Sequence, residues 1–216
     1  MTDQSAEPRT VDPRFAQLSE DKLQLLAGYV ADIVALDSDI ESVLDRQLGL
    51  TKNDSLAGPL VRGFHDSVRD QRNMMIELRD AMGEEQVVHA LRDKGSTVLG
   101  AVAGVIGKLR GEGISKALRD DYAAFNLAAV SYTMLLTTAR AVGSTDMASA
   151  AEKGLRTYAA AVQKINHAIP PVVLAELASK NQVSVSSDVA EEVLRTIDSV
   201  WKSTDQSKNT PQAAPR

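Results

Sequence analysis

Four polar side chains, Asp37, Gln71, Tyr132 and Tyr158, interrupt stripes of apolar residues spaced three and four apart. Such spacing indicates helices whose apolar sides face a shared core. A buried carboxylate is costly unless it is protonated or hydrogen-bonded, and two phenols and an amide can donate to it. We therefore predict a buried polar network of these four residues. A network that works in neutral form predicts that Asp37→Asn leaves stability nearly unchanged.

A metal site is the alternative interpretation of the same region. Its candidate ligands are Asp37, His65, Asp66 and Asp121. Hard cations require several oxygen donors, and di-iron centres in helical bundles use about four carboxylates together with Glu-x-x-His on two helices. That motif occurs nowhere in the chain. We therefore expect no metal and no cofactor, and iron is expected only if a divergent di-metal site exists.

The remaining residue types do not suggest a catalytic site. The three histidines, His65, His89 and His167, are too scattered to predict a ligand cluster. The glycine-containing segments lack the strand context of a nucleophile elbow or a phosphate-binding loop. We predict no catalytic residue and do not expect an enzyme.

Long helices must position these side chains. The apolar periodicity predicts helices over 19–48, 59–82 and 114–142, and a fourth after residue 146 that ends or kinks at Pro170 and Pro171. Two short links make two antiparallel hairpins, and the long connection between the hairpins can run from one end of the bundle to the other. The predicted class is all-α: a ferritin-like four-helix bundle with a long crossover and an additional C-terminal helix.

The chain divides into four predicted parts. Residues 18–180 form the bundle and residues 186–202 an accessory amphipathic helix, whereas residues 1–17 and 203–216 are polar, proline-containing tails predicted to be disordered. The crossover contains a glycine-interrupted apolar run at 98–107. We interpret this run as buried, with close helix contact and shallow membrane insertion as alternatives, because it is too short to span a bilayer.

Four short segments carry a resemblance to a known family: Ala35-Leu36-Asp37, Leu44-Asp45-Arg46-Gln47-Leu48, Ala129-Val130-Ser131-Tyr132 and Leu155-Arg156-Thr157-Tyr158. Over roughly residues 30–172 the chain resembles the YciE/YciF family of ferritin-like proteins, a group linked to bacterial stress responses. The resemblance implies a four-helix bundle with a di-iron site in its interior.

Most ligand positions that the resemblance implies are replaced in this chain. The first-helix glutamate falls on Asp37, and the second-helix histidine falls at Phe64 or His65. The third-helix glutamate falls on Ala128, and the last acidic pair falls on Thr157 and Tyr158. The resemblance therefore implies a bundle whose metal site is degenerate.

Composition and charge argue against several classes of partner. The net charge of −5 argues against nucleic acid as a partner, and the absence of cysteine favours the cytoplasm. No apolar stretch is long enough to span a membrane, and we do not expect membrane association. The predicted function is a non-catalytic, stress-related bundle that serves as a structural or protein-binding module, through a protein partner or self-association. The alternative is a divergent di-metal iron-binding or oxidase protein.

Overall fold

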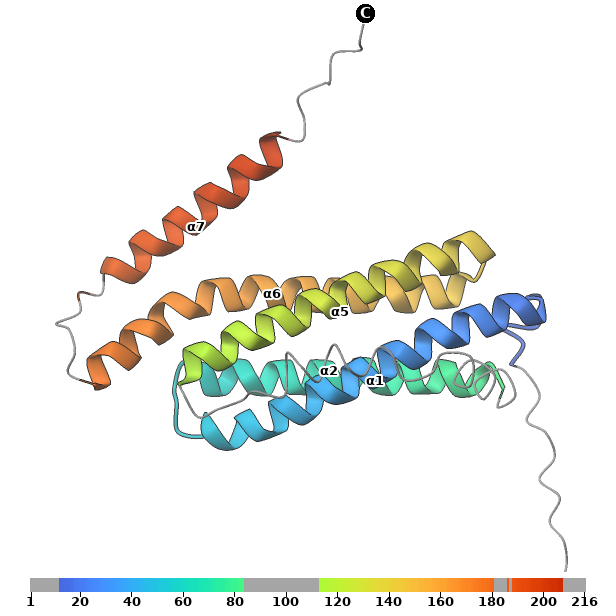
Figure 1. Cartoon of the computed structure of the whole chain (residues 1–216), viewed down its shortest axis with the longest axis horizontal. Helices are drawn as coiled ribbons and strands as arrows, with labels where there is room; N and C mark the ends of the chain where they lie inside the picture. Colours follow the sequence, from blue (N-terminus) through green and yellow to red (C-terminus); the bar gives the residue numbers. More distant parts are fainter. Residues whose placement is uncertain (1–11, 84–112, 181–185, 187, 208–216) are drawn as a thin grey trace, which may run out of the picture.

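The structure is a computed structural model that describes residues 12–83, 113–180, 186 and 188–207. Its helices are α1 (Glu20–Leu50), α2 (Ala57–Ala81), α5 (Ile114–Val142), α6 (Thr145–Ser179) and α7 (Asp188–Ser207), as Figure 1 shows. Across these ranges no residue lies in a strand. The all-α prediction is confirmed.

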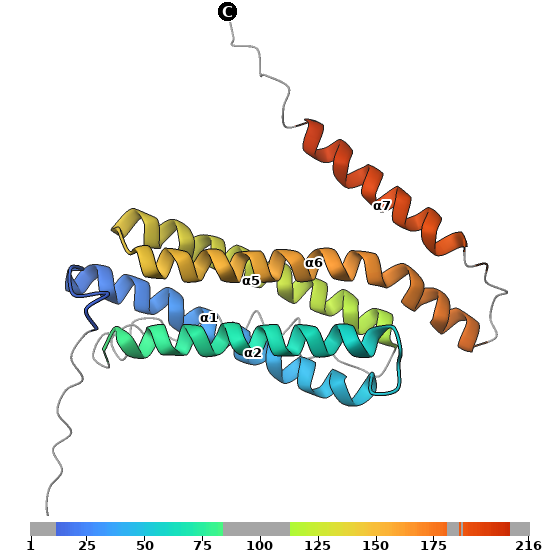
Figure 2. The same cartoon turned by 180° about the vertical axis from the view of Figure 1, so that it is seen from behind.

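Four of the helices form a bundle made of two antiparallel hairpins. Helix α1 pairs with α2 and helix α5 with α6, while α1 also packs on α5 and α2 on α6. The end of α2 and the start of α5 lie at opposite ends of the bundle (Figures 1 and 2). The predicted crossover between α2 and α5 lies outside the described residues. Both His89 and the apolar run at 98–107 fall outside the described residues.

Local signals mark the start of α2 and the end of α5. The Oδ1 atom of Asp54 accepts hydrogen bonds from the backbone N–H groups of Leu56 and Ala57, at 2.9 and 2.7 Å, and so caps α2. Gly143 ends α5 with φ of 84°, a left-handed conformation that glycine adopts without strain. Helix α6 does not end at Pro170 and Pro171: it continues to Ser179, and Figure 1 shows its last part turning away from the first.

The apolar stripes of α1, α2, α5 and α6 meet in one core. Its largest fully buried side chains, apart from two tyrosines, are Phe15, Phe125, Leu26, Ile33, Leu44, Met75, Met82, Leu118, Leu135 and Met147. The packing of these side chains places the polar residues of the stripes away from water.

Phe15 corrects the predicted N-terminal boundary, which placed residues 1–17 in a disordered tail. Its side chain is fully buried, and the backbone N–H of Asp12 donates to the carbonyl of Ala81 at 3.0 Å. Burying a phenylalanine contributes about 1.5–3 kcal/mol, which offsets part of the entropy of ordering this short segment. Residues 12–17 therefore belong to the bundle, and residues 1–11 lie outside the described part.

Helix α7 packs against α6 and is the fifth helix that the periodicity predicted. It extends to Ser207, so the predicted boundary at residue 202 is too early, and residues 203–207 are helical rather than part of a disordered tail. Among the helices that the structure describes, none is long and apolar enough to cross a membrane.

Candidate functional site

Asp37 lies in the middle of α1 and is fully buried. The Tyr158 hydroxyl, on α6, donates a hydrogen bond to its Oδ1 atom at 2.5 Å. The Tyr132 hydroxyl, on α5, donates to Oδ2 at 2.7 Å. Both oxygens of one carboxylate are thus satisfied by two other helices, and these three residues form the centre of the predicted network.

Burial raises the pKa of Asp37 to about 7, against the opposing effect of the two tyrosine hydrogen bonds. The positive charge of Arg72 also lowers this pKa, and the negative charge of Glu41 raises it. The pKa values of both tyrosines rise because the phenols are buried beside a carboxylate. The two phenols therefore stay protonated at neutral pH, whereas the Asp37 carboxyl gains or loses its proton near neutral pH.

Gly154 on α6 gives the Tyr132 ring its space. A Cβ atom at this position would lie 2.2 Å from Cε1 of Tyr132 and 2.7 Å from Nε2 of Gln71. Gln71 is buried at the same place, and its amide lowers the pKa of Tyr132. All four residues of the predicted network therefore come together. The sequence analysis missed Gly154, although an isolated glycine inside a helical pattern signals a close approach.

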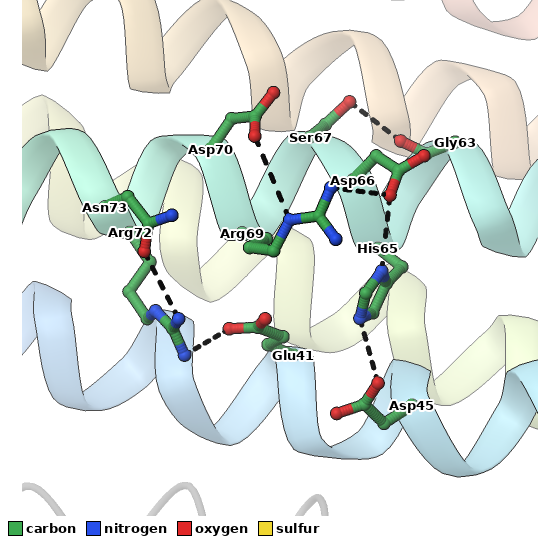
Figure 3. A network of polar contacts seen from close by, with 10 residues as sticks. All are labelled: Glu41, Asp45, Gly63, His65, Asp66, Ser67, Arg69, Asp70, Arg72 and Asn73. Atoms are coloured by element: carbon green, nitrogen blue, oxygen red, sulfur yellow. Dashed lines mark hydrogen bonds and ion pairs between the residues drawn. The ribbon is translucent and has the colours of Figure 1, made fainter.

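A buried ion pair lies next to this cluster. Glu41 follows Asp37 by one turn of α1, is 8% exposed, and pairs with Arg72 of α2. Figure 3 shows this pair between the two helices, with the Arg72 guanidinium also donating to Asn73 at 3.2 Å. The pair extends the polar contacts from the core to the α1–α2 seam.

His65 belongs to that seam rather than to the Asp37 cluster. Its Nε2 lies 2.9 Å from Oδ1 of Asp45, and its Nδ1 lies 3.5 Å from Oδ1 of Asp66 (Figure 3). Phe64, one residue earlier, occupies the core with only 3% exposure. The imidazole is therefore held between surface carboxylates, and Asp66 points to it and to Arg69.

Asp121 forms a second buried polar pair, with Gln47. The Gln47 amide donates to Oδ1 of Asp121 at 2.8 Å, while Oδ2 of Asp121 and Oε1 of Gln47 have no hydrogen-bond partner. Burial raises the pKa of Asp121 to about 7, although the Gln47 hydrogen bond lowers it. Asp121 precedes Tyr132 by eleven residues on α5, which places it about 16 Å from the Asp37 cluster along the helix.

The four candidate metal ligands are therefore spread over three places. Asp37 is bonded to tyrosines, His65 and Asp66 are at the α1–α2 seam, and Asp121 is paired with Gln47. Within the described ranges, no group of three or more His, Asp or Glu side chains is arranged to hold a metal ion. Among the described residues, the groups bonded to Asp37 are hydroxyls, and the nearby carboxylate of Glu41 is paired with Arg72, so the described residues do not fit a di-iron centre.

One cavity outside the core lies between α5, α6 and α7. It has a volume of about 430 Å³, and its walls include Tyr122, Asn126, His167 and Trp201. His167 Nε2 lies 3.2 Å from Oδ1 of Asp198 and joins α6 to α7. The cavity is partly polar, since the His167–Asp198 pair and Lys202 are part of its wall.

Comparisons with protein-family models, with curated proteins and with solved structures find no match for this chain.

Proposed function

We propose that this chain is a non-catalytic helical-bundle module that acts through its outer surface, on a protein partner or on another copy of itself. The observation that carries this proposal is the arrangement around Asp37. Both of its oxygens accept hydrogen bonds from Tyr132 and Tyr158. A metal bound there would have to displace these bonds, and the neighbouring carboxylate of Glu41 is paired with Arg72. The interior is thus suited to holding helices together.

The exterior supports the same proposal. Helix α7 has one apolar side, yet Val193 and Trp201 are 40% and 53% exposed. Apolar side chains of an amphipathic helix gain free energy when they are covered, and a partner protein can cover them. The resemblance to the YciE/YciF family adds a role in bacterial stress, in the cytoplasm, to the proposal.

Iron binding tests this proposal directly. The purified chain is incubated with ferrous iron, desalted, and assayed for iron by mass spectrometry, next to an Asp37→Asn variant of nearly equal size. We expect far less than one iron per chain in both proteins. About two irons per chain, the content of a di-iron centre, lost in Asp37→Asn while circular dichroism shows an unchanged helix content, would overturn the proposal.

A further inference from the structure

The cavity between α5, α6 and α7 has the size of a small-molecule site. Its volume is about 430 Å³, and pockets that bind small molecules commonly measure roughly 300–1,000 Å³. Helix α7 packs on α6, and both views of the chain show α7 leaning away from α6 toward its C-terminal end (Figures 1 and 2). Residues of all three helices line the cavity, so a molecule bound there would contact the bundle and α7 together.

Two aromatic rings line this cavity from different helices, Tyr122 from α5 and Trp201 from α7. The ring–ring contacts among the described residues all lie in the core, so these two rings do not contact each other. Trp201 is 53% exposed, and the aliphatic side chains of Ala129, Val162 and Ile197 complete the apolar wall. Because aromatic rings stack favourably on other flat rings, this part of the wall suits a planar molecule.

Three side-chain amides form much of the polar wall: Asn126, Gln163 and Asn166. The Asn126 amide nitrogen donates to the carbonyl of Tyr122 at 2.8 Å, which leaves the Asn126 oxygen as an acceptor. Neither Gln163 nor Asn166 makes a side-chain hydrogen bond to another described residue. An amide presents a donor beside an acceptor, and this pair is complementary to a heteroaromatic ring that carries an amine next to a ring nitrogen.

The charges of the wall favour a neutral molecule. Asp198 and Lys202 carry opposite charges and lie one turn apart on α7. His167 Nε2 lies 3.2 Å from Oδ1 of Asp198. With a neutral histidine the wall carries no net charge, so an ionic ligand would lose its hydration without gaining an uncompensated opposite charge.

We propose that this cavity binds a neutral, planar heteroaromatic molecule of nucleoside size, stacked between Tyr122 and Trp201 and hydrogen-bonded by Gln163 and Asn166. Such a ligand holds α7 against the bundle, because Trp201 belongs to α7 and the other three residues belong to α5 and α6. The site does not depend on the proposed function, to which it adds a small-molecule ligand.

Trp201 gives a direct readout, because it is the chain's only tryptophan. The full chain, labelled with ¹⁵N, is titrated with adenosine while the single indole N–H signal is followed by NMR, and calorimetry measures the Kd. We expect the indole signal to shift and a Kd on the order of 100 µM. The flat anion 2-naphthoate lacks ring nitrogens and should bind about ten-fold more weakly. Ribose alone should not shift the signal, and a short oligoadenylate RNA should bind no more tightly than adenosine.

Two variants test the two parts of the wall. Trp201→Leu removes the stacking surface and Asn166→Leu removes an amide, and each should weaken adenosine binding about ten-fold by calorimetry. Met134→Ala, which shortens an exposed apolar side chain of α5 that does not line the cavity, should leave the Kd unchanged. Circular dichroism verifies that each variant keeps its helix content.

Four results would overturn the inference. The first is an indole signal that stays in place at an adenosine concentration about 50-fold above the expected Kd. The second is equal binding of adenosine and 2-naphthoate, which would indicate an unselective apolar surface. The third is tighter binding of the oligoadenylate, which would indicate a nucleic-acid site. The fourth is an unchanged Kd in both folded variants, Trp201→Leu and Asn166→Leu. The iron assay tests the proposed function separately.

Discussion

Asp37 and Asp121 are two buried carboxyl groups with the same pKa direction and different surroundings. Burial raises the pKa of each to about 7. Both oxygens of Asp37 accept from tyrosines on two other helices, whereas only one oxygen of Asp121 accepts, from Gln47. Burial therefore raises the proton affinity of both carboxyl groups. The hydrogen bonds that each group accepts determine how strongly the stability of the folded structure depends on that group.

The two carboxyl groups also differ in the number of helices that their hydrogen bonds connect. The Asp37 cluster joins α1, α5 and α6 at one point, and Gly154 opens the space that the cluster needs. The pair at Asp121 joins only α1 and α5 and leaves two polar atoms without partners. Both oxygens of Asp37 are hydrogen-bonded in the first arrangement, where Nε2 of Gln71 alone has no hydrogen-bond partner among the four network residues, and the second arrangement is a weaker contact.

The largest expected effect is the loss of the Asp37 carboxylate. Asp37→Ala leaves two buried tyrosine hydroxyls without an acceptor, and each such group costs about 1–3 kcal/mol. Asp121→Ala leaves one amide donor and should cost about half as much. Urea unfolding at pH 6 measures both variants. An equal loss for the two would break the comparison.

Gly154→Ala should have the next largest effect. In an exposed helix this change stabilises by about 1 kcal/mol, but here the new methyl meets the ring of Tyr132, so we expect a loss of about 1–3 kcal/mol. Gly63→Ala on α2, where a Cβ would meet nothing within 4 Å, is the matched control and should stabilise. Thermal unfolding of both variants checks this, and a stabilising Gly154→Ala would show that the ring has room to move.

A change of pH tests both carboxyl groups without replacing a residue, and it should have the smallest effect on the structure. Both carboxyls keep their protons up to a pKa of about 7, whereas in the unfolded chain they lose them near pH 4. The folded state therefore binds more protons between these values, and its stability falls as pH rises from about 5 to 7. Each group contributes about 1.4 kcal/mol per pH unit.

Matched Asp→Asn variants distinguish the contributions of Asp37 and Asp121 to this pH dependence. Either substitution removes one carboxyl and should halve the slope of unfolding free energy between pH 5 and 7. At pH 5 the neutral Asp37 carboxyl has one donor and one acceptor, as the amide of Asn has, so Asp37→Asn should change the free energy of unfolding little at this pH. The expectation from the sequence, that Asp37→Asn leaves stability nearly unchanged, therefore stays a prediction for acidic pH. Asp121→Asn keeps the Gln47 bond and should cost equally little. A flat pH profile of the natural chain would contradict this account.

The sequence by itself determined the helices and the central polar residues. The three- and four-residue spacing of apolar side chains is a local property, and a polar residue on such a stripe must be buried wherever the helices meet. Helix α5 was predicted at Ile114–Val142, where the structure has it, and Asp37, Tyr132 and Tyr158 were predicted to share a network.

Only the tertiary structure decided which side chains meet across the bundle. Gln47 and Asp121 are 74 residues apart, and no local pattern marks them as partners. Phe15 is buried because it meets the end of the bundle, and Gly154 is required because the Tyr132 ring crosses α6 at that height. Periodicity gives the side of a helix that faces inward, but relative height and rotation of neighbouring helices depend on the packing of the whole core.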